Sequence, residues 1–204
     1  MSAPLDAGGV NRIPTGGRID RAQPVSITHD GQLLGGFVGD TVAATLLAHD
    51  QHLVARSFKY HRPRGIMAAG VEEPNALLTV GSGARQEPNI AATVLELQYG
   101  LHTRSQNAWP SVRFDLMAVN SLLSPFFVAG FYYKTFMGPT RKAWMFYEHF
   151  IRKAAGLGTA TTLADPDRYD WQHGFTDVLV IGSGPAGLTA ALGAARAGLD
   201  VTLV

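Results

Sequence analysis

The sequence predicts two folding units in series: an α+β domain of β-grasp type, followed by the opening of an α/β Rossmann unit. Three observations lead to this prediction. A pattern typical of a β-hairpin begins near residue 24, and a short helical pattern follows it in the sequence. An apolar strand, a glycine turn and an Ala-rich helix follow one another near residue 180. The 204 residues, 46% of them hydrophobic, suffice for one full core and part of a second.

The hairpin is the first element of the β-grasp pattern. Apolar and polar residues alternate over 25–28, and Asp30-Gly31 supplies the positive φ of a tight turn before the apolar run 32–38. Asp40 is expected to cap the next helix, whose apolar residues recur at helical spacing. A hairpin followed by a helix is how a β-grasp domain starts.

Later strands of this domain are predicted at 75–80 and at 92–97, where apolar residues cluster between turn signals. Between the helix and these strands lies a basic loop, Lys59–Arg64, in which Pro63 prevents helix formation. This loop could contact a flavin phosphate or an acidic partner surface, but its composition alone is more simply explained by a solvated basic loop.

The domain limits follow from changes in composition along the chain. We expect a flexible, glycine-rich leader over 1–23, the β-grasp domain over 24–105, a helical aromatic-rich bridging segment over 106–174, and the start of the Rossmann domain over 175–204.

Within the bridging segment, the clearest helix is predicted for Arg141–Ala155, with Gly156 as its C-terminal stop. The rings between Phe114 and Phe150 are expected to pack between the two domains rather than to form a substrate box.

Composition excludes several classes of function. A net charge of +1 without a long block of one sign gives no electrostatic basis for binding nucleic acid. The absence of cysteine excludes disulfides, thiolate zinc sites and cysteine-ligated iron-sulfur clusters. No stretch has the pattern of a signal peptide, and the apolar run 122–133 is too short for a membrane helix. We therefore expect a cytoplasmic protein without a membrane partner.

The motif that carries chemistry is a glycine fingerprint after the apolar run Asp177–Ile181. Its residues are Gly182, Ser183, Gly184, Pro185, Ala186 and Gly187, which match G-x-G-x-x-G. The first glycine permits a tight turn, the second lets the backbone approach a pyrophosphate, and the third allows the helix to pack on the strand. The helix that follows would direct its N-terminal amides at the pyrophosphate of NAD or FAD.

The acidic residue that would bind the adenosine ribose is expected about 20 residues after the fingerprint. Val204 stands just before that position, so the sequence is expected to be a fragment of a longer chain. Alone, it should bind a dinucleotide weakly or not at all. A metal site is not predicted, because His49 and His52 beside Asp50 lack further ligands at zinc-like spacing.

Three long strings carry a resemblance to a known family. They are Ser57–Ile66, Gln106–Ser111 and Ala129–Met137, and together with Asp177–Gly187 they span most of the chain from residue 24 onward. In these strings the chain resembles the N-terminal part of the alpha subunits of heterotetrameric sarcosine oxidases.

The resemblance implies that the first domain is ferredoxin-like, related to domains that hold a two-iron cluster. The loop equivalent to the cluster loop is 65–74, and it contains Ala68, Ala69, Gly70, Val71 and Glu72 in place of any ligand. Because iron-sulfur clusters are held by cysteine thiolates, no cluster is expected here.

The resemblance also implies a flavin-dependent complex that oxidises sarcosine to glycine, with hydrogen peroxide and either formaldehyde or methylene-tetrahydrofolate as products. Its partners would be beta, gamma and delta subunits. NAD would lie at the fingerprint, FMN between alpha and beta subunits, FAD in the beta subunit, and tetrahydrofolate on a C-terminal domain that these residues do not include. The catalytic residues cannot be named from this sequence.

Two alternatives stay open at this point. The fingerprint alone cannot distinguish FAD from NAD, so the chain could belong to another FAD- or NAD-linked amine dehydrogenase or reductase. A first domain without cysteines could also be a non-catalytic assembly module.

Overall fold

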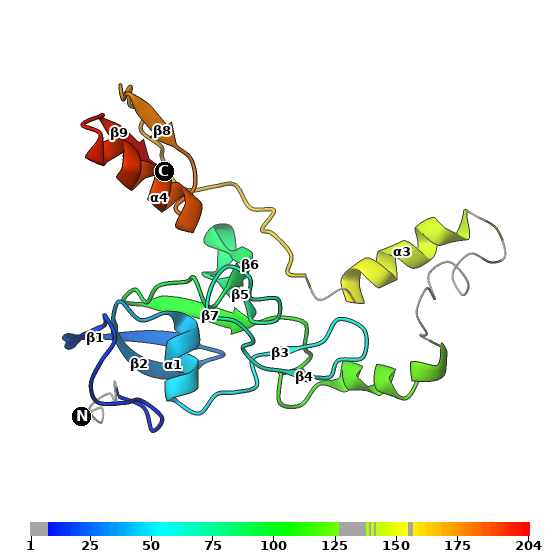
Figure 1. Ribbon diagram of the computed structural model, residues 1–204. Coiled ribbons are helices and arrows are strands. Elements are labelled where there is room, and N and C mark those ends of the chain that lie inside the picture. The colour runs from blue at the N-terminus through cyan, green and yellow to red at the C-terminus, as the bar shows by residue number, and fades with distance from the viewer. Residues whose placement is uncertain (1–7, 127–137, 139, 141, 155–156) are drawn as a thin grey trace. The chain divides into compact units, whose positions relative to one another are not determined.

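The computed structural model describes residues 8–126, 138, 140, 142–154 and 157–204. The chain divides into two compact units, Met1–Pro166 and Asp167–Val204 (Figure 1). Each unit is described by itself below.

The first unit is built on a mixed sheet that begins with the predicted hairpin. Strands β1 (Asp20–His29) and β2 (Gln32–Val38) pair antiparallel. Asp30 and Gly31 connect them with φ values of 47° and 81°. These left-handed conformations give a two-residue turn the twist that suits a hairpin, so the hairpin prediction is confirmed.

Three further strands complete the sheet in the order β2-β1-β7-β5-β6. Strand β7 (Leu101–Ser105) runs parallel to β1, whereas β5 (Leu77–Val80) is antiparallel to both β7 and β6 (Glu87–Ala91). A separate pair, β3 (Ala55–Arg56) and β4 (Pro63–Arg64), brackets the basic loop. A 3-10 turn, η1 (Gly83–Arg85), precedes β6.

Helix α1 (Val42–Ala48) packs on this sheet and closes the core (Figure 1). Its Leu46 is fully buried together with Ile27 of β1 and Leu78 of β5. Strand β2 lies so close to the helix that a Cβ at Gly36 would lie 2.7 Å from the Thr45 hydroxyl oxygen. Burial of these apolar side chains supplies the main driving force for this unit.

The strand predicted for 92–97 is wrong. This segment gives its carbonyl groups to the first turn of α1: Val42 N donates to Leu95 O at 2.8 Å, and Ala43 N donates to Ala92 O at 2.9 Å. A helix leaves its first amides without partners inside the helix, and here a neighbouring segment accepts from them. Ala92 and Leu97 of this segment are buried in the core, whereas Val94 is 49% exposed, and none of residues 92–97 belongs to a strand of the sheet.

The predicted helix cap is also wrong by one residue. Thr41 is the N-cap, and its hydroxyl accepts from Ala44 N at 3.2 Å. Asp40 is buried, accepts from Phe37 N at 2.9 Å, and forms an ion pair with Arg12 at 2.8 Å. Both residue types can cap a helix, and the ion pair with a distant arginine directs Asp40 to another role.

The glycine-rich leader also departs from expectation over its described part. Asn11 N donates to Ala48 O at 3.0 Å, at the end of α1, and Arg12 holds Asp40. Strand β1 already begins at Asp20. Asn11 and Arg12 thus make specific contacts at the end of α1 and just before its start, where the composition alone predicts a flexible segment.

The aromatic segment contains the 3-10 turns η2 (Leu116–Ser121) and η3 (Ser124–Phe126) and the helix α3 (Ala143–Ala154). The helix predicted for Arg141–Ala155 is confirmed between residues 143 and 154; its predicted end residues and the stop at Gly156 lie outside the described residues. Phe146 and Phe150 are 66% and 57% exposed. Packing of these rings between the domains stays a prediction.

The second unit consists of β8 (Val178–Val180), α4 (Pro185–Arg196) and β9 (Val201–Leu203). The two strands pair parallel, with Leu179 opposite Thr202. Parallel neighbours joined through a helix form the βαβ arrangement that the sequence predicts.

Buried His29 gives the first unit a predicted pH dependence. His29 lies in β1, with its Nδ1 3.0 Å from the Thr103 hydroxyl. Burial lowers the pKa of His29 below its ordinary 6.5, and the charge of Asp30 opposes this only in part. Because the unfolded chain then binds the proton more tightly, stability should be complete above pH 6.5 and fall as the pH decreases toward the folded-state pKa.

This pH dependence can be measured by urea unfolding between pH 7.5 and pH 5. Replacing His29 with glutamine should flatten the profile through this range, since glutamine does not titrate. His102→Gln is the matched control, because His102 is exposed on the neighbouring strand β7. An unchanged profile in His29→Gln would contradict the assignment.

Candidate functional site

The glycine fingerprint forms the turn between β8 and α4. Gly182 leaves β8 with a φ of +103°, a conformation that side-chain-bearing residues rarely adopt. Its N–H donates to Val204 O at 2.6 Å, and Val204 N donates to Val180 O at 3.0 Å, so the end of β9 holds the start of the turn. The first glycine therefore does what the motif predicts.

The third glycine allows the helix to approach the strand. A Cβ at Gly187 would overlap the carbonyl oxygen of Gly182, which is backbone and cannot move aside as a side chain could. Gly187 also lies near a methyl group of Val180. No residue larger than glycine fits between the turn and the strand, as the close-packing role of this position requires.

Helix α4 begins directly after the middle glycine of the fingerprint, and the backbone at this glycine is accessible to solvent. Gly184 is the N-cap of α4, Pro185 stands in its first turn, and Leu188 N donates to Gly184 O at 2.9 Å. A Cβ at Gly184 would meet no atom within 4 Å, and residues 182–186 are exposed. A phosphate could therefore reach the first amides of α4, where the helix dipole favours negative charge.

The side chains of Thr176 and Asp177 connect the starts of the two strands in this unit. Asp177 Oδ2 accepts from Asp200 N at 2.9 Å, and the Thr176 hydroxyl donates to Asp200 O at 2.9 Å. These bonds join the entry to β8 with the entry to β9 and keep the two strands in register. The apolar pattern of the strands does not reveal this connection.

A second feature, in the first unit, is the loop over 65–76, which is organised around one carboxylate. Glu73 is only 4% exposed, and four backbone N–H groups donate to its two oxygens. The donors and their distances are Met67 at 2.6 Å, Ala68 at 2.7 Å, Asn75 at 2.7 Å and Ala76 at 3.0 Å. Sequence reasoning missed this residue, because a Glu72-Glu73 pair before proline looks like an ordinary polar turn.

The pKa of Glu73 follows from this environment. Burial, the largest single influence, acts to raise it, whereas the backbone donors from Ala68, Asn75, Ala76 and Met67 act to lower it. Together the donors prevail and hold the pKa of Glu73 below its ordinary value. The loop thus contains a fixed negative charge, and no cysteine is present to bind iron.

The basic loop is tied down from both sides. The Arg56 guanidinium donates to Val112 O at 2.7 Å and to His61 O at 3.2 Å. His61 is buried with a φ of +51°, and its Nδ1 lies 2.6 Å from the Asp115 carboxylate, which is fully buried. Neither the His61–Asp115 pair nor the role of Arg56 was foreseen, since their sequence separation leaves no local pattern.

The histidines near residue 50 separate in the structure. His49 Nε2 lies 2.7 Å from Gly35 O, whereas His52 Nε2 lies 2.9 Å from Asp50 Oδ1 on the surface. Within the described residues, no group of three or more ligating side chains could hold a metal ion. His49 instead links the end of α1 to strand β2.

Two family models match parts of the chain. Residues 22–108 match the 2Fe-2S iron-sulfur cluster binding domain, and residues 177–204 match the FAD binding domain. The first match covers the mixed sheet and the second covers the β8-α4-β9 unit. Since the chain contains no cysteine and Glu73 fills the loop over 65–76, these residues do not fit a cluster.

Curated relatives match nearly the whole chain. The sarcosine oxidase subunit alpha of Rhizobium meliloti is 58% identical over 95% of this chain and 20% of its own length. The predicted resemblance to sarcosine oxidase alpha subunits is confirmed. Alpha subunits from two Corynebacterium strains, U-96 and P-1, are 38% and 36% identical over 93% and 92% of this chain and 15% of their own length.

This chain therefore spans about a fifth or less of the sarcosine oxidase alpha subunits that it matches. Among solved structures, L-proline dehydrogenase from P. horikoshii matches 90% of this chain and 25% of its own chain, at 18% identity and a TM-score of 0.37. No helix in the described part of the chain is long and apolar enough to cross a membrane.

Proposed function

We propose that this chain is the N-terminal part of the alpha subunit of a flavin-dependent sarcosine oxidase. The complex would oxidise the N-methyl group of sarcosine and release glycine, hydrogen peroxide, and formaldehyde or methylene-tetrahydrofolate. The observation that carries the proposal is the 58% identity to an alpha subunit over 95% of the chain, which includes the glycine turn. Beta, gamma and delta subunits would be its partners, in the cytoplasm.

The proposed contribution of these residues is to hold a dinucleotide. Gly182, Ser183, Gly184, Pro185, Ala186 and Gly187 would bind its pyrophosphate. The fit is supported by the left-handed Gly182, the open backbone at Gly184 and the lack of room for a Cβ at Gly187. NAD or FAD, when bound, would accept or pass on a hydride. The match to a FAD-binding model favours FAD, whereas the resemblance to sarcosine oxidase implies NAD.

The domain limits belong to the same proposal. A cluster-free β-grasp domain over 24–105, an aromatic bridging segment over 106–174 and the start of the nucleotide-binding domain over 175–204 would give the alpha subunit its order of parts. FMN between subunits, FAD in the beta subunit and tetrahydrofolate would supply the remaining chemistry. None of the described side chains is assigned a catalytic role.

A direct test is to attach an affinity tag to this chain in its source cell and to purify what assembles with it. The expected result is a yellow complex of several subunits, with flavin absorbance and sarcosine-dependent formation of hydrogen peroxide. A colourless complex that forms no peroxide from sarcosine would defeat the proposal. Peroxide or dye reduction with other amines only would indicate another amine dehydrogenase.

A second function is favoured by one specific observation. The first unit retains the sheet that matches a cluster-binding family but has a buried carboxylate and no thiolate in the corresponding loop. Such a domain could serve assembly alone. If deletion of residues 24–105 removed the partner subunits from the purified complex while nucleotide content per alpha chain stayed unchanged, the assembly function would be supported.

A further inference from the structure

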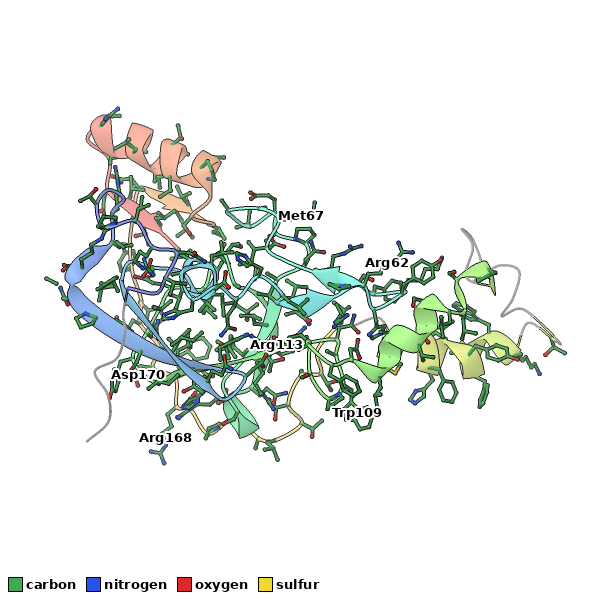
Figure 2. All side chains as sticks on the ribbon, turned by 90° about the horizontal axis from the view of Figure 1, so that it is seen from below. Arg62, Met67, Trp109, Arg113, Arg168 and Asp170 are labelled. Atoms are coloured by element: carbon green, nitrogen blue, oxygen red, sulfur yellow. The ribbon has the colours of Figure 1, made fainter. Side chains whose placement is uncertain are left out.

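A cavity of about 400 Å³ lies beside the basic loop of the first unit. It opens between the β3–β4 connection and the segment that follows β7, and Figure 2 shows Arg62 on this connection. The cavity is separate in sequence from the glycine turn, and its volume falls within the range of small-molecule sites. Its lining includes four cations, namely Arg56, Lys59, Arg62 and Arg64.

All the charged side chains named in this lining are positive. Among the described residues that line the cavity, none is an aspartate or a glutamate. The described part of the chain also shows no ion pair at Arg62 or Arg64, and both side chains are exposed. Arg56, Arg62 and Arg64 place three positive charges in this lining, and such charges repel one another unless an anion binds between them, which makes the site favourable for a multivalent anion.

Two of the cations, Arg56 and Arg62, are held in place by neutral groups that leave their charge intact. The Arg56 guanidinium donates to the carbonyl groups of Val112, His61 and Arg113. Arg62 lies over the ring of Tyr60, with its guanidinium carbon 4.8 Å from the ring centre. Carbonyl oxygens and ring faces orient a guanidinium without neutralising it. The loop is therefore preorganised for binding.

The buried pair of His61 and Asp115 holds the basic loop in place. His61 and Asp115 are 3% and 0% exposed at their side chains and lie 2.6 Å apart, so the chain between the cations is anchored to the segment that follows β7. The Ser57 hydroxyl accepts from Arg62 N at 2.9 Å and closes the loop on itself. Preorganisation of this kind lowers the entropic cost of binding a ligand.

The rest of the lining suits an organic ligand rather than an inorganic ion. Leu77 and Leu157 contribute apolar surface, and the ring of Phe58 is 40% exposed at the cavity. Asn75 and Asn107 add amide groups. A single phosphate ion would leave most of the volume unfilled and these surfaces without contact.

We propose that this cavity binds a small organic phosphate, with the phosphate group on Arg62 and Arg64 and the carbon skeleton against Phe58. Guanidinium groups bind phosphate through paired hydrogen bonds, which a lone ammonium group cannot reproduce. The site does not use the glycine turn over 182–187, and it is independent of the proposed oxidase activity.

The test is a nuclear magnetic resonance titration of the 204-residue chain with adenosine 5′-monophosphate. Saturable shifts are expected in the backbone amides of residues 56–64 and 75–77. Inorganic phosphate and adenosine, each at the same concentration, should give much smaller shifts there. Arg62→Ala/Arg64→Ala should weaken binding at least about 10-fold, because two charge-assisted contacts are lost.

The control variant removes the same charge elsewhere. Arg18→Ala/Arg168→Ala loses two exposed arginines outside the cavity and should bind like the unchanged chain. Phe58→Ser, which keeps every cation, should weaken adenosine 5′-monophosphate more than phosphate. The proposal is overturned if the shifts fall only in 182–188, if phosphate alone binds equally well, or if both double variants bind alike.

Discussion

Replacing Glu73 with alanine is expected to lower the free energy of unfolding of the first unit by about 3 kcal/mol. The reason is the number of groups that depend on this side chain. Four backbone N–H groups donate to it inside the loop over 65–76, and alanine would leave them without acceptors in a nearly closed site. Urea unfolding, followed by the amide signals of β1 and β5, measures the change in this unit.

The neighbouring Glu72 is the matched control, since it has the same side chain but lies exposed. Glu72→Ala should change the free energy of unfolding by less than about 0.5 kcal/mol. Equal effects of the two substitutions would show that the Glu73 side chain does not organise the loop.

Glu73 should also make the free energy of unfolding of the first unit depend on pH in the acidic range. Its pKa is lower in the folded chain than the ordinary 4.5, so its contribution is complete above that pH and is lost as the pH falls through the folded-state pKa. Glu73→Gln cannot titrate and should lose this dependence. A profile for Glu73→Gln that falls as steeply in acid as that of the unchanged chain would contradict the assignment.

Gly187→Ala is expected to weaken binding of the dinucleotide at least about 10-fold, equivalent to about 1.4 kcal/mol or more. The added Cβ would overlap the carbonyl oxygen of Gly182, so α4 would have to move away from β8 and carry its first amides off the pyrophosphate. NAD and FAD should both be titrated into the complex purified through this chain, with the fall in protein fluorescence as the signal.

Gly193→Ala provides the control within the same helix. Its Cβ would meet no atom within 4 Å, and alanine favours a helix over glycine by about 1 kcal/mol. Binding should therefore stay unchanged, and α4 should become slightly more stable. If Gly187→Ala bound the dinucleotide as tightly as Gly193→Ala does, the glycine turn would not be the binding site.

The elements that the sequence predicts well are those specified by neighbouring residues. Asp30-Gly31 determines the β1–β2 hairpin because few residues tolerate two successive positive φ values. The fingerprint determines the β8-α4 turn because each glycine meets a separate steric demand. In both places a short string contains the whole physical cause.

The segment over 92–97 shows where local patterns fail. Its apolar residues have the composition of a strand, but their backbone accepts from the first turn of α1, which lies about fifty residues earlier in the chain. The prediction that Asp40 caps α1 is wrong for the same reason. Its partner Arg12 is remote in sequence, and the adjacent Thr41 caps the helix instead. Local propensity cannot include the demands of a distant partner.

The sequence by itself therefore determined the hairpin, the glycine turn and the absence of thiolate ligands, since each depends on residue type or on a few adjacent residues. Tertiary structure alone decided that Glu73 gathers four amides, that His61 joins Asp115 below the basic loop, and that four cations share one cavity. These features depend on burial and on contacts between distant segments, because a polar group removed from water must find its partner wherever the folded chain provides one.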